Sequence, residues 1–268
     1  MGICQETIHL LGGFPVAFIR RVAGGEDAGD TIVFVHGFGS AKEHFRYAFD
    51  SPSLEGFPLI ATDLVGFGRS RGPEDFGYSM EEQGKVVLQI LERLEIRRFH
   101  LCAHSMGGLV AMCMAEKVRD RVLSLVNMEG NLTPEDCTIS GRVAGLTGEE
   151  FAEDGRRRLE ETLRKAGADD TSMSEYAETF AAASTTALYM SSVHTVADSS
   201  TPLVGRLSRI KNVCFIYGEK NRGVYPGEAL LRAAGIPLFY IPGAGHAMAT
   251  ENPGELYRVI RAFIDGLQ

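Results

Sequence analysis

Ser105 is the residue of this chain that is best placed for covalent chemistry. It follows an apolar run at residues 99–103 and precedes a stretch of helical periodicity that begins near Met106. This order predicts a strand, a sharp turn and a helix, with the serine hydroxyl raised at the tip of the turn. Gly107 and Gly108 provide the space that such a close approach of backbone segments requires. The Met106 amide can then face the oxyanion that forms when the serine attacks a carbonyl group.

The residues around the serine, Ala103-His-Ser-Met-Gly107, form a small-x-Ser-x-Gly pattern. Small residues and serine are common in turns, so the interpretation depends on the expected strand before the pattern and the helix after it. Together these features resemble the nucleophile elbow of the α/β-hydrolase superfamily, with Ala103 in the place of the usual first glycine. The resemblance covers nearly the whole chain apart from one helical insertion.

A second motif, His36-Gly-Phe38, follows the apolar run at residues 31–35. In the superfamily a His-Gly-x loop at this point supplies an oxyanion donor. The resemblance therefore implies that the Phe38 backbone amide acts beside the Met106 amide. A glycine-rich turn between a strand and a helix is the alternative interpretation.

A third motif runs from Asp63 to Ser70 and matches the superfamily's Asp-x-x-Gly-x-Gly-x-Ser segment. It is neither the Walker sequence nor the dinucleotide fingerprint, which argues against phosphate binding. We interpret Asp63 as a structural carboxylate that accepts hydrogen bonds from backbone amides.

A nucleophilic serine needs a base within hydrogen-bond reach and a carboxylate that orients the base. His246 lies in a glycine-flanked loop after the last expected strand, where the superfamily places its catalytic histidine, and the resemblance implies that it is the base. Other histidines are rivals, and the two that flank the oxyanion loop and the elbow are expected to pack or hydrogen-bond locally. The rivals are His36, His44, His104 and His194.

The acid departs from the usual pattern of the superfamily. Most members carry it after strand seven in a Gly-x-x-Asp turn, but this chain has Gly218-Glu-Lys-Asn221. Loss of the carboxylate from a serine triad costs about four orders of magnitude in rate. Some haloalkane dehalogenases carry the acid one strand earlier, and this resemblance implies that Glu129 is the triad acid. Glu219, or a site without an acid, is the alternative.

Composition and charge limit the classes of partner. The chain has 268 residues, 44% of them hydrophobic, and a net charge of −8 at pH 7, which argues against nucleic acid as the main partner. No apolar run approaches the roughly 20 residues that span a bilayer, so we expect no membrane insertion. The N-terminus lacks the features of a signal peptide, and five irregularly spaced cysteines indicate reduced thiols. These observations predict a cytoplasmic protein that acts on a small-molecule substrate.

The elements that must position these residues alternate along the chain. The first two expected strands form a hairpin, and Ser79 with Glu82 form a capping box at the start of the first long helix. The expected strands are residues 6–11, 16–21, 31–35, 59–62, 99–103, 122–128, 212–217 and 238–241, and the expected core helices are residues 80–94, 226–234 and 253–267 besides the one near residue 106. This alternation predicts an α/β fold with a doubly wound, mostly parallel sheet of eight strands.

Residues 131–207 contain helical patterns and no expected strand. The insertion resembles the helical cap that the superfamily carries after strand six. We therefore divide the chain into a core of residues 1–130 and 208–268 and a cap of residues 131–207. Candidate pocket residues are His36 from the core and five residues of the cap, for which ordinary packing is the alternative: Met173, Tyr176, Phe180, Tyr189 and Met190.

The resemblance and the serine imply an esterase-like serine hydrolase. We expect it to cleave a small or medium, mainly apolar ester, thioester or related acyl compound through an acyl-enzyme on Ser105. Dehalogenases and epoxide hydrolases of this fold use an aspartate nucleophile, which excludes those reactions. Neither metal-ligand spacing nor the mechanism indicates a metal or cofactor. The alternatives are a carbon–carbon bond hydrolase, a perhydrolase, an acyltransferase, a lyase, or a binding or signalling module with low turnover.

Overall fold

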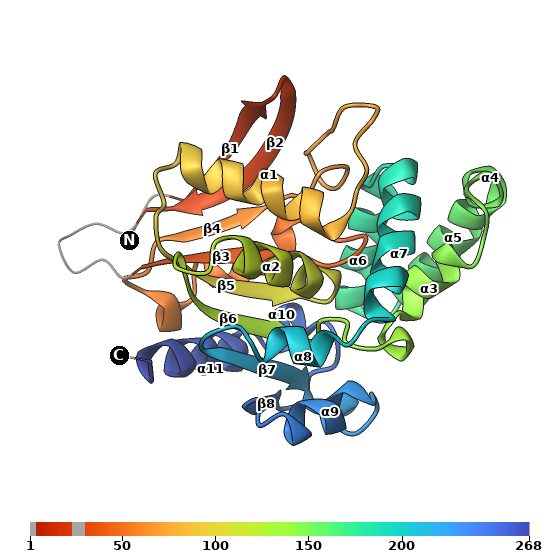
Figure 1. The fold of residues 1–268 in the computed structure, drawn as a ribbon. Coiled ribbons are helices and arrows are strands. Elements are labelled where there is room, and N and C mark those ends of the chain that lie inside the picture. The colour runs from red at the N-terminus through yellow and green to blue at the C-terminus, as the bar shows by residue number, and fades with distance from the viewer. Residues whose placement is uncertain (1–3, 23–29, 268) are drawn as a thin grey trace.

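Eight strands form one mixed sheet in the computed structural model, which describes residues 4–22 and 30–267 (Figure 1). The strand order is β1-β2-β4-β3-β5-β6-β7-β8. The β1–β2 and β2–β4 pairs are antiparallel and the other pairs are parallel. The strands are β1 (Cys4–Leu11), β2 (Phe14–Arg21), β3 (Thr31–Val35), β4 (Leu59–Thr62), β5 (Phe99–His104), β6 (Val122–Met128), β7 (Val213–Gly218) and β8 (Leu238–Ile241). The predicted eight-stranded, mostly parallel sheet is confirmed.

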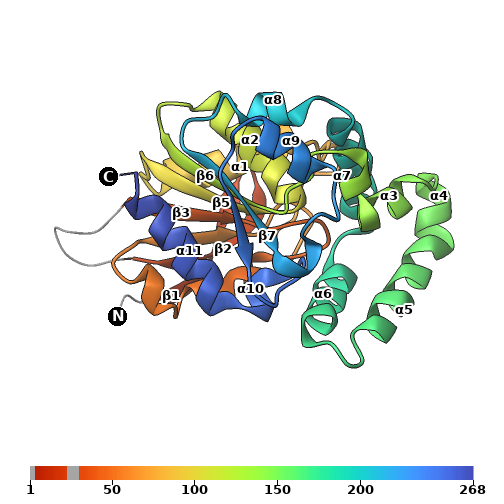
Figure 2. The ribbon, with the colours of Figure 1, turned by 90° about the horizontal axis from the view of Figure 1, so that it is seen from below.

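Helices cover both faces of the sheet, as the two views show (Figures 1 and 2). One face carries α1 (Met80–Arg93), α2 (Met106–Lys117) and α9 (Gly227–Ala233), and the other carries η1 (Lys42–Ala48), α10 (Met248–Glu251) and α11 (Pro253–Asp265). Alternate residues of β3 illustrate why the strand is apolar throughout. Val33 and Val35 pack into one hydrophobic cluster, whereas Ile32 and Phe34 pack into the cluster on the opposite face.

The first long helix begins where its capping box predicts. The Ser79 hydroxyl accepts from the Glu82 amide at 3.2 Å, and the Glu82 carboxylate accepts from the Ser79 amide at 3.1 Å. These two bonds satisfy backbone donors that the first turn of a helix leaves free. The face of α1 that carries Val86, Val87, Ile90 and Leu91 is buried.

Only helices and turns occupy residues 129–212, all of which the structure describes. Residues 134–199 lie beside the carboxyl ends of the parallel strands, whereas residues 203–207 lie next to α2 and α9 (Figures 1 and 2). The α-helices are α3 (Thr138–Ala144), α4 (Gly148–Glu150), α5 (Arg156–Ala166), α6 (Thr171–Ala182), α7 (Thr185–Ser199) and α8 (Leu203–Leu207). The division into a core and a cap, with its boundaries at residues 131 and 207, stays a prediction.

Asp63 holds the glycine-rich loop after β4 against the start of η1. Its carboxylate accepts from the backbone amides of Lys42 and Arg69, both at 2.8 Å, and forms an ion pair with the Lys42 ammonium at 3.0 Å. Both charged side chains are fully buried. Gly68, at a φ of +50°, is needed here because a Cβ would lie 2.3 Å from Asp63 Oδ2. Asp63 is therefore a structural carboxylate, as predicted.

Replacement of Asp63 by alanine is expected to lower the free energy of unfolding by about 3–5 kcal/mol, because it leaves a buried ammonium and two amides without this partner. Urea denaturation measures the change. Glu43→Gln is the matched control, since Glu43 also pairs with Lys42 but is 47% exposed, and it should cost less than about 1 kcal/mol. Equal effects of the two substitutions would contradict the prediction.

Candidate active site

Ser105 lies in a sharp turn between β5 and α2, with φ 53° and ψ −128°. Its amide donates to the Met128 carbonyl at 3.0 Å, which ties the turn to the end of β6. A Cβ at Gly107 would lie 2.5 Å from the carbonyl oxygens of Val35 and His36, so this position requires glycine. The strand, turn and helix that the sequence predicts around the serine are present.

The His246 ring is hydrogen-bonded to the carboxylate of Glu129. Nδ1 of His246 donates to Oε2 of Glu129 at 2.7 Å. The Glu129 side chain is 2% exposed, whereas the His246 side chain is 49% exposed. The other oxygen of Glu129 accepts from the Gly218 amide at 2.7 Å, and Asn221 Nδ2 donates to both oxygens at 3.1 and 2.9 Å. The carboxylate is thus held at the ends of β6 and β7 and aimed at the imidazole.

Glu219, the alternative acid, lies in the turn η5 (Glu219–Asn221) and is exposed. Its carboxylate accepts from the Gly243 amide at 3.0 Å. Of the two glutamates, Glu129 makes the contact with His246.

His104 packs against His246, and His44 packs against His104. The His104 ring lies with its centroid 4.5 Å from that of His246 and stacks on the His44 ring, also at 4.5 Å. His104 Nε2 donates to the His246 carbonyl at 2.8 Å. Burial lowers the pKa of His44 to about 3 and lowers the pKa of His104 well below its usual value, so both rings are neutral at pH 7.

His36 binds two loops together instead of facing the cavity. Its Nε2 accepts from the Leu64 amide at 3.0 Å, and its Nδ1 therefore carries the hydrogen that is donated to the Gly37 carbonyl at 2.8 Å. Burial lowers the pKa of His36 and keeps the ring neutral. His194 lies elsewhere, with its Nε2 3.1 Å from the Gly77 carbonyl.

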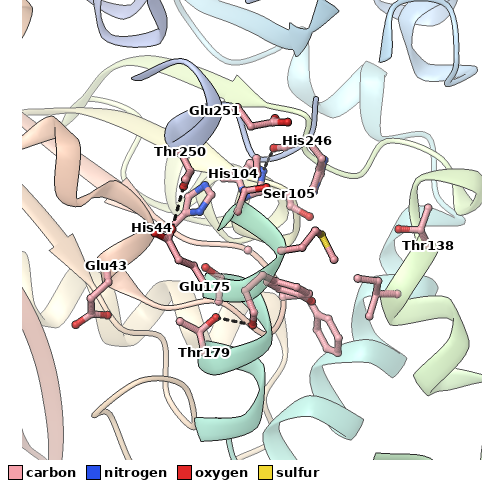
Figure 3. A pocket seen from close by; sticks show the side chains of 18 of the residues that line it. Glu43, His44, His104, Ser105, Thr138, Glu175, Thr179, His246, Thr250 and Glu251 are labelled. Carbon is pink, nitrogen blue, oxygen red and sulfur yellow. Dashed lines mark hydrogen bonds between the residues drawn. The ribbon is translucent and has the colours of Figure 1, made fainter. Parts of the chain in front are cut away.

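A cavity of about 430 Å³ opens above Ser105 and His246, between the carboxyl ends of the strands and α6. Figure 3 shows His44 and His104 beside these two residues and α6, with Glu175 and Thr179, across the cavity. Apolar surface comes from Phe38, Ile139, Met173, Tyr176 and Ala247. The cavity is therefore partly apolar and contains both the serine and the histidine.

The predicted pocket residues are divided between the cavity wall and the packing behind it. Met173 and Tyr176 line the cavity, and the wall formed by the described residues does not include His36, Phe180, Tyr189 or Met190. Phe180 is fully buried against Phe38, with 6.2 Å between the ring centroids, and Tyr189 stacks on Phe151 at 6.4 Å. These apolar residues belong to the packing that the sequence analysis kept as the alternative.

Several lining residues were not singled out from the sequence. Ser172, Glu175 and Thr179 share one face of α6 with Met173 and Tyr176. The Glu175 carboxylate forms an ion pair with Arg46 of η1 and accepts from Thr250 of α10 at 3.5 Å. The three α6 residues could have been predicted from the sequence, because helical spacing places them on the same face as Met173 and Tyr176.

The loop after β3 contacts the serine turn directly. A Cβ at Gly37 would lie 2.8 Å from the Cβ of Ser105. Within residues 4–22 and 30–267, the backbone amides of Phe38 and Met106 donate to no protein acceptor. Phe38 lines the cavity, and Met106, which is fully buried, directly follows Ser105.

Part of the chain is similar in sequence to known enzymes. A probable lysophospholipase, BODYGUARD 2 of Arabidopsis thaliana, is 29% identical over 112 residues, which are 40% of this chain and 24% of that protein. Lipase 1 of Psychrobacter immobilis is 34% identical over 102 residues, which are 38% of this chain and 32% of that protein. The matched segments thus span about a quarter to a third of these relatives.

Two solved structures share the fold over nearly the full chain. A thermophilic esterase from Thermogutta terrifontis has a TM-score of 0.78 at 21% identity and covers 98% of this chain and 99% of its own. An N-acyl homoserine lactonase in complex with N-hexanoyl homoserine has a TM-score of 0.78 at 17% identity and covers 99% of this chain and 98% of its own. Helices that could cross a bilayer are absent from the residues that the structure describes.

The alpha/beta hydrolase fold family matches residues 30–174, which is more than half of the chain and includes the β3 loop and the serine turn. Together with the sheet order and the shared fold, this match shows that the chain belongs to the α/β-hydrolase family.

Proposed function

We propose that the protein is a serine hydrolase that cleaves a small or medium, mainly apolar ester or thioester. The observation that carries the proposal is the 2.7 Å contact between His246 Nδ1 and the buried Glu129 carboxylate, at the wall of the cavity that also holds Ser105. An oriented base and a serine in a strained turn are the components of a nucleophilic site. Ser105 is the nucleophile, His246 the base and Glu129 the acid of the proposed triad.

In the proposed reaction, Ser105 Oγ attacks the carbonyl carbon of the substrate and His246 Nε2 takes the hydroxyl proton. Glu129 accepts from Nδ1, which selects the required tautomer and stabilises the imidazolium. The Phe38 and Met106 amides bind the oxyanion. The intermediate collapses to an acyl-serine, and the imidazolium protonates the leaving alcohol or thiol. Water, activated by His246, then releases the acid and restores the serine.

The cavity supports an apolar acyl substrate of limited size. Its volume of about 430 Å³ is in the range of small-ligand sites, and Ile139, Met173 and Tyr176 give it apolar surface. The names of the similar proteins support ester chemistry, because a lysophospholipase, a lipase, an esterase and a lactonase all act on carboxylic esters.

Ser105→Ala is expected to lower kcat for p-nitrophenyl butyrate by at least about 1,000-fold, because it removes the nucleophile. Glu129→Gln should lower kcat by about 10,000-fold, because it removes the charge that stabilises the imidazolium. Steady-state and burst kinetics measure both effects. Glu219→Gln is the control and should remain within about twofold of the wild type, because Glu219 binds Gly243.

A wild-type enzyme that is acylated once and does not turn over would contradict the hydrolase proposal. Near-normal turnover by Ser105→Ala would contradict the mechanism. A large loss of kcat in Glu219→Gln with little loss in Glu129→Gln would show that Glu219, and not Glu129, is the triad acid.

Gly37→Ala is expected to lower kcat/KM by about 100-fold, because the new methyl group must push the Phe38 loop away from Ser105 and displace one oxyanion donor. The rate of Ser105 labelling by a fluorophosphonate provides a second readout. Gly205→Ala is the control, since a Cβ there would meet nothing within 4 Å. If both alanine variants keep wild-type kcat/KM, the Phe38 amide is not an oxyanion donor.

A further inference from the structure

Asn221 occupies the position after β7 where most of the family carries the triad acid, and its side chain binds the carboxylate that replaces that acid. Asn221 Nδ2 lies 3.1 Å from Glu129 Oε1 and 2.9 Å from Oε2. A carboxylate is a pure acceptor, so the nitrogen of the amide must face it and the orientation of the amide is determined. Asn221 therefore donates across both oxygens of Glu129.

The bonds to Glu129 are arranged so that one oxygen is left for the imidazole. Oε1 accepts from the Gly218 amide and from Asn221, whereas Oε2 accepts from Asn221 and from His246. The Gly218 bond alone leaves the carboxylate able to rotate about its last torsion. The Asn221 amide spans the two oxygens and sets the plane of the carboxylate, which aims Oε2 at His246 Nδ1.

The negative charge of Glu129 also favours a neutral donor, such as the Asn221 side-chain amide, at position 221. A carboxylate at position 221 would bring two anions to about 3 Å in a largely buried place, and one of them would have to take up a proton. A neutral donor stabilises the negative charge on Glu129 without competing for the imidazole. The glutamate after β6 and the asparagine after β7 thus form a matched pair.

We propose that Asn221 is a positioning residue, which acts on His246 through Glu129. The catalytic consequence rests on the proposed function, whereas the structural consequence does not. Loss of the amide should loosen the Glu129–His246 hydrogen bond and slow proton transfer, while the cavity that binds substrate stays unchanged, because Asn221 does not line it among the described residues.

Asn221→Leu removes the donors at similar volume and keeps water away from the carboxylate. The expected result is a 10- to 100-fold lower kcat for p-nitrophenyl butyrate, in line with loss of hydrogen bonds to a charged group, with KM within about twofold of the wild type. Asn221 is partly exposed in a surface turn, so the variant should fold, and circular dichroism checks this. If Asn221→Leu disturbs the turn, Asn221→Ala serves as the second variant.

A double-mutant cycle separates positioning from a general effect on the turn. If Asn221 acts through Glu129, then Asn221→Leu should change kcat less than about threefold in a Glu129→Gln background. The same fold-loss in both backgrounds, or a kcat of a folded Asn221→Leu within about threefold of the wild type, would overturn the proposal. Glu219→Gln is the matched control, because it changes the same turn without touching Glu129.

Proton NMR tests the inference without any turnover. The Nδ1 proton shared by His246 and Glu129 should give a low-field resonance in the wild type and in Glu219→Gln, and should be absent in Glu129→Gln. In Asn221→Leu it should move upfield or broaden as the hydrogen bond loosens. An unchanged resonance in the folded variant would overturn the positioning role, whereas an inactive wild type with a shifted resonance in Asn221→Leu would overturn the proposed function alone.

Discussion

A buried carboxylate holds the loops of the site in one arrangement. Glu129 follows β6, accepts from Gly218 and Asn221 at the end of β7, and binds His246 after β8. A buried anion is tolerated only when its oxygens are hydrogen-bonded, so these bonds must form together. The position of the His246 imidazole is consequently determined by the loops that follow β6, β7 and β8.

Close backbone contact supports the other half of the site. Gly107 lets α2 approach the carbonyl groups at the end of β3, and Gly37 lets the β3 loop touch Ser105. His36 then connects that loop to Leu64, and Asp63 connects the Leu64 loop to Lys42. The loops around the serine are therefore connected by a buried hydrogen-bond network, which supports the proposed oxyanion donors.

The wall formed by α6 contacts the core through the buried Phe180 ring and through polar side chains. Its polar links to the core run through Glu175, which pairs with Arg46 and accepts from Thr250 at 3.5 Å. The two charged side chains are 34% and 33% exposed, and ion pairs of this kind contribute about 0–1 kcal/mol. The strand ends are thus linked by buried hydrogen bonds, whereas α6 is linked to the core by a partly exposed ion pair and by the buried Phe180 ring.

The local signals in the chain determined the elements and the serine turn. These signals are local, because each depends only on residues that are close in the sequence. Examples are the apolar run at residues 31–35, the capping box at Ser79 and the small residues around Ser105. The match to the family pattern then indicated His246 as the base, and it left Glu129, Glu219 or a site without an acid as the alternatives. Each of these features depends on a short stretch of sequence and not on contacts between distant residues.

The tertiary structure alone decided which glutamate meets the imidazole and which helical side chains face the cavity. Glu129 and Glu219 both follow strands that end at the same edge of the sheet, and the 2.7 Å contact of Glu129 with His246 depends on the path of three separate loops. In the helical segment, Tyr176 faces the cavity and Phe180 faces the core, although both are aromatic residues of α6. Apolar periodicity identifies a buried face of a helix but not the surface against which it is buried, because that surface comes from residues distant in the sequence.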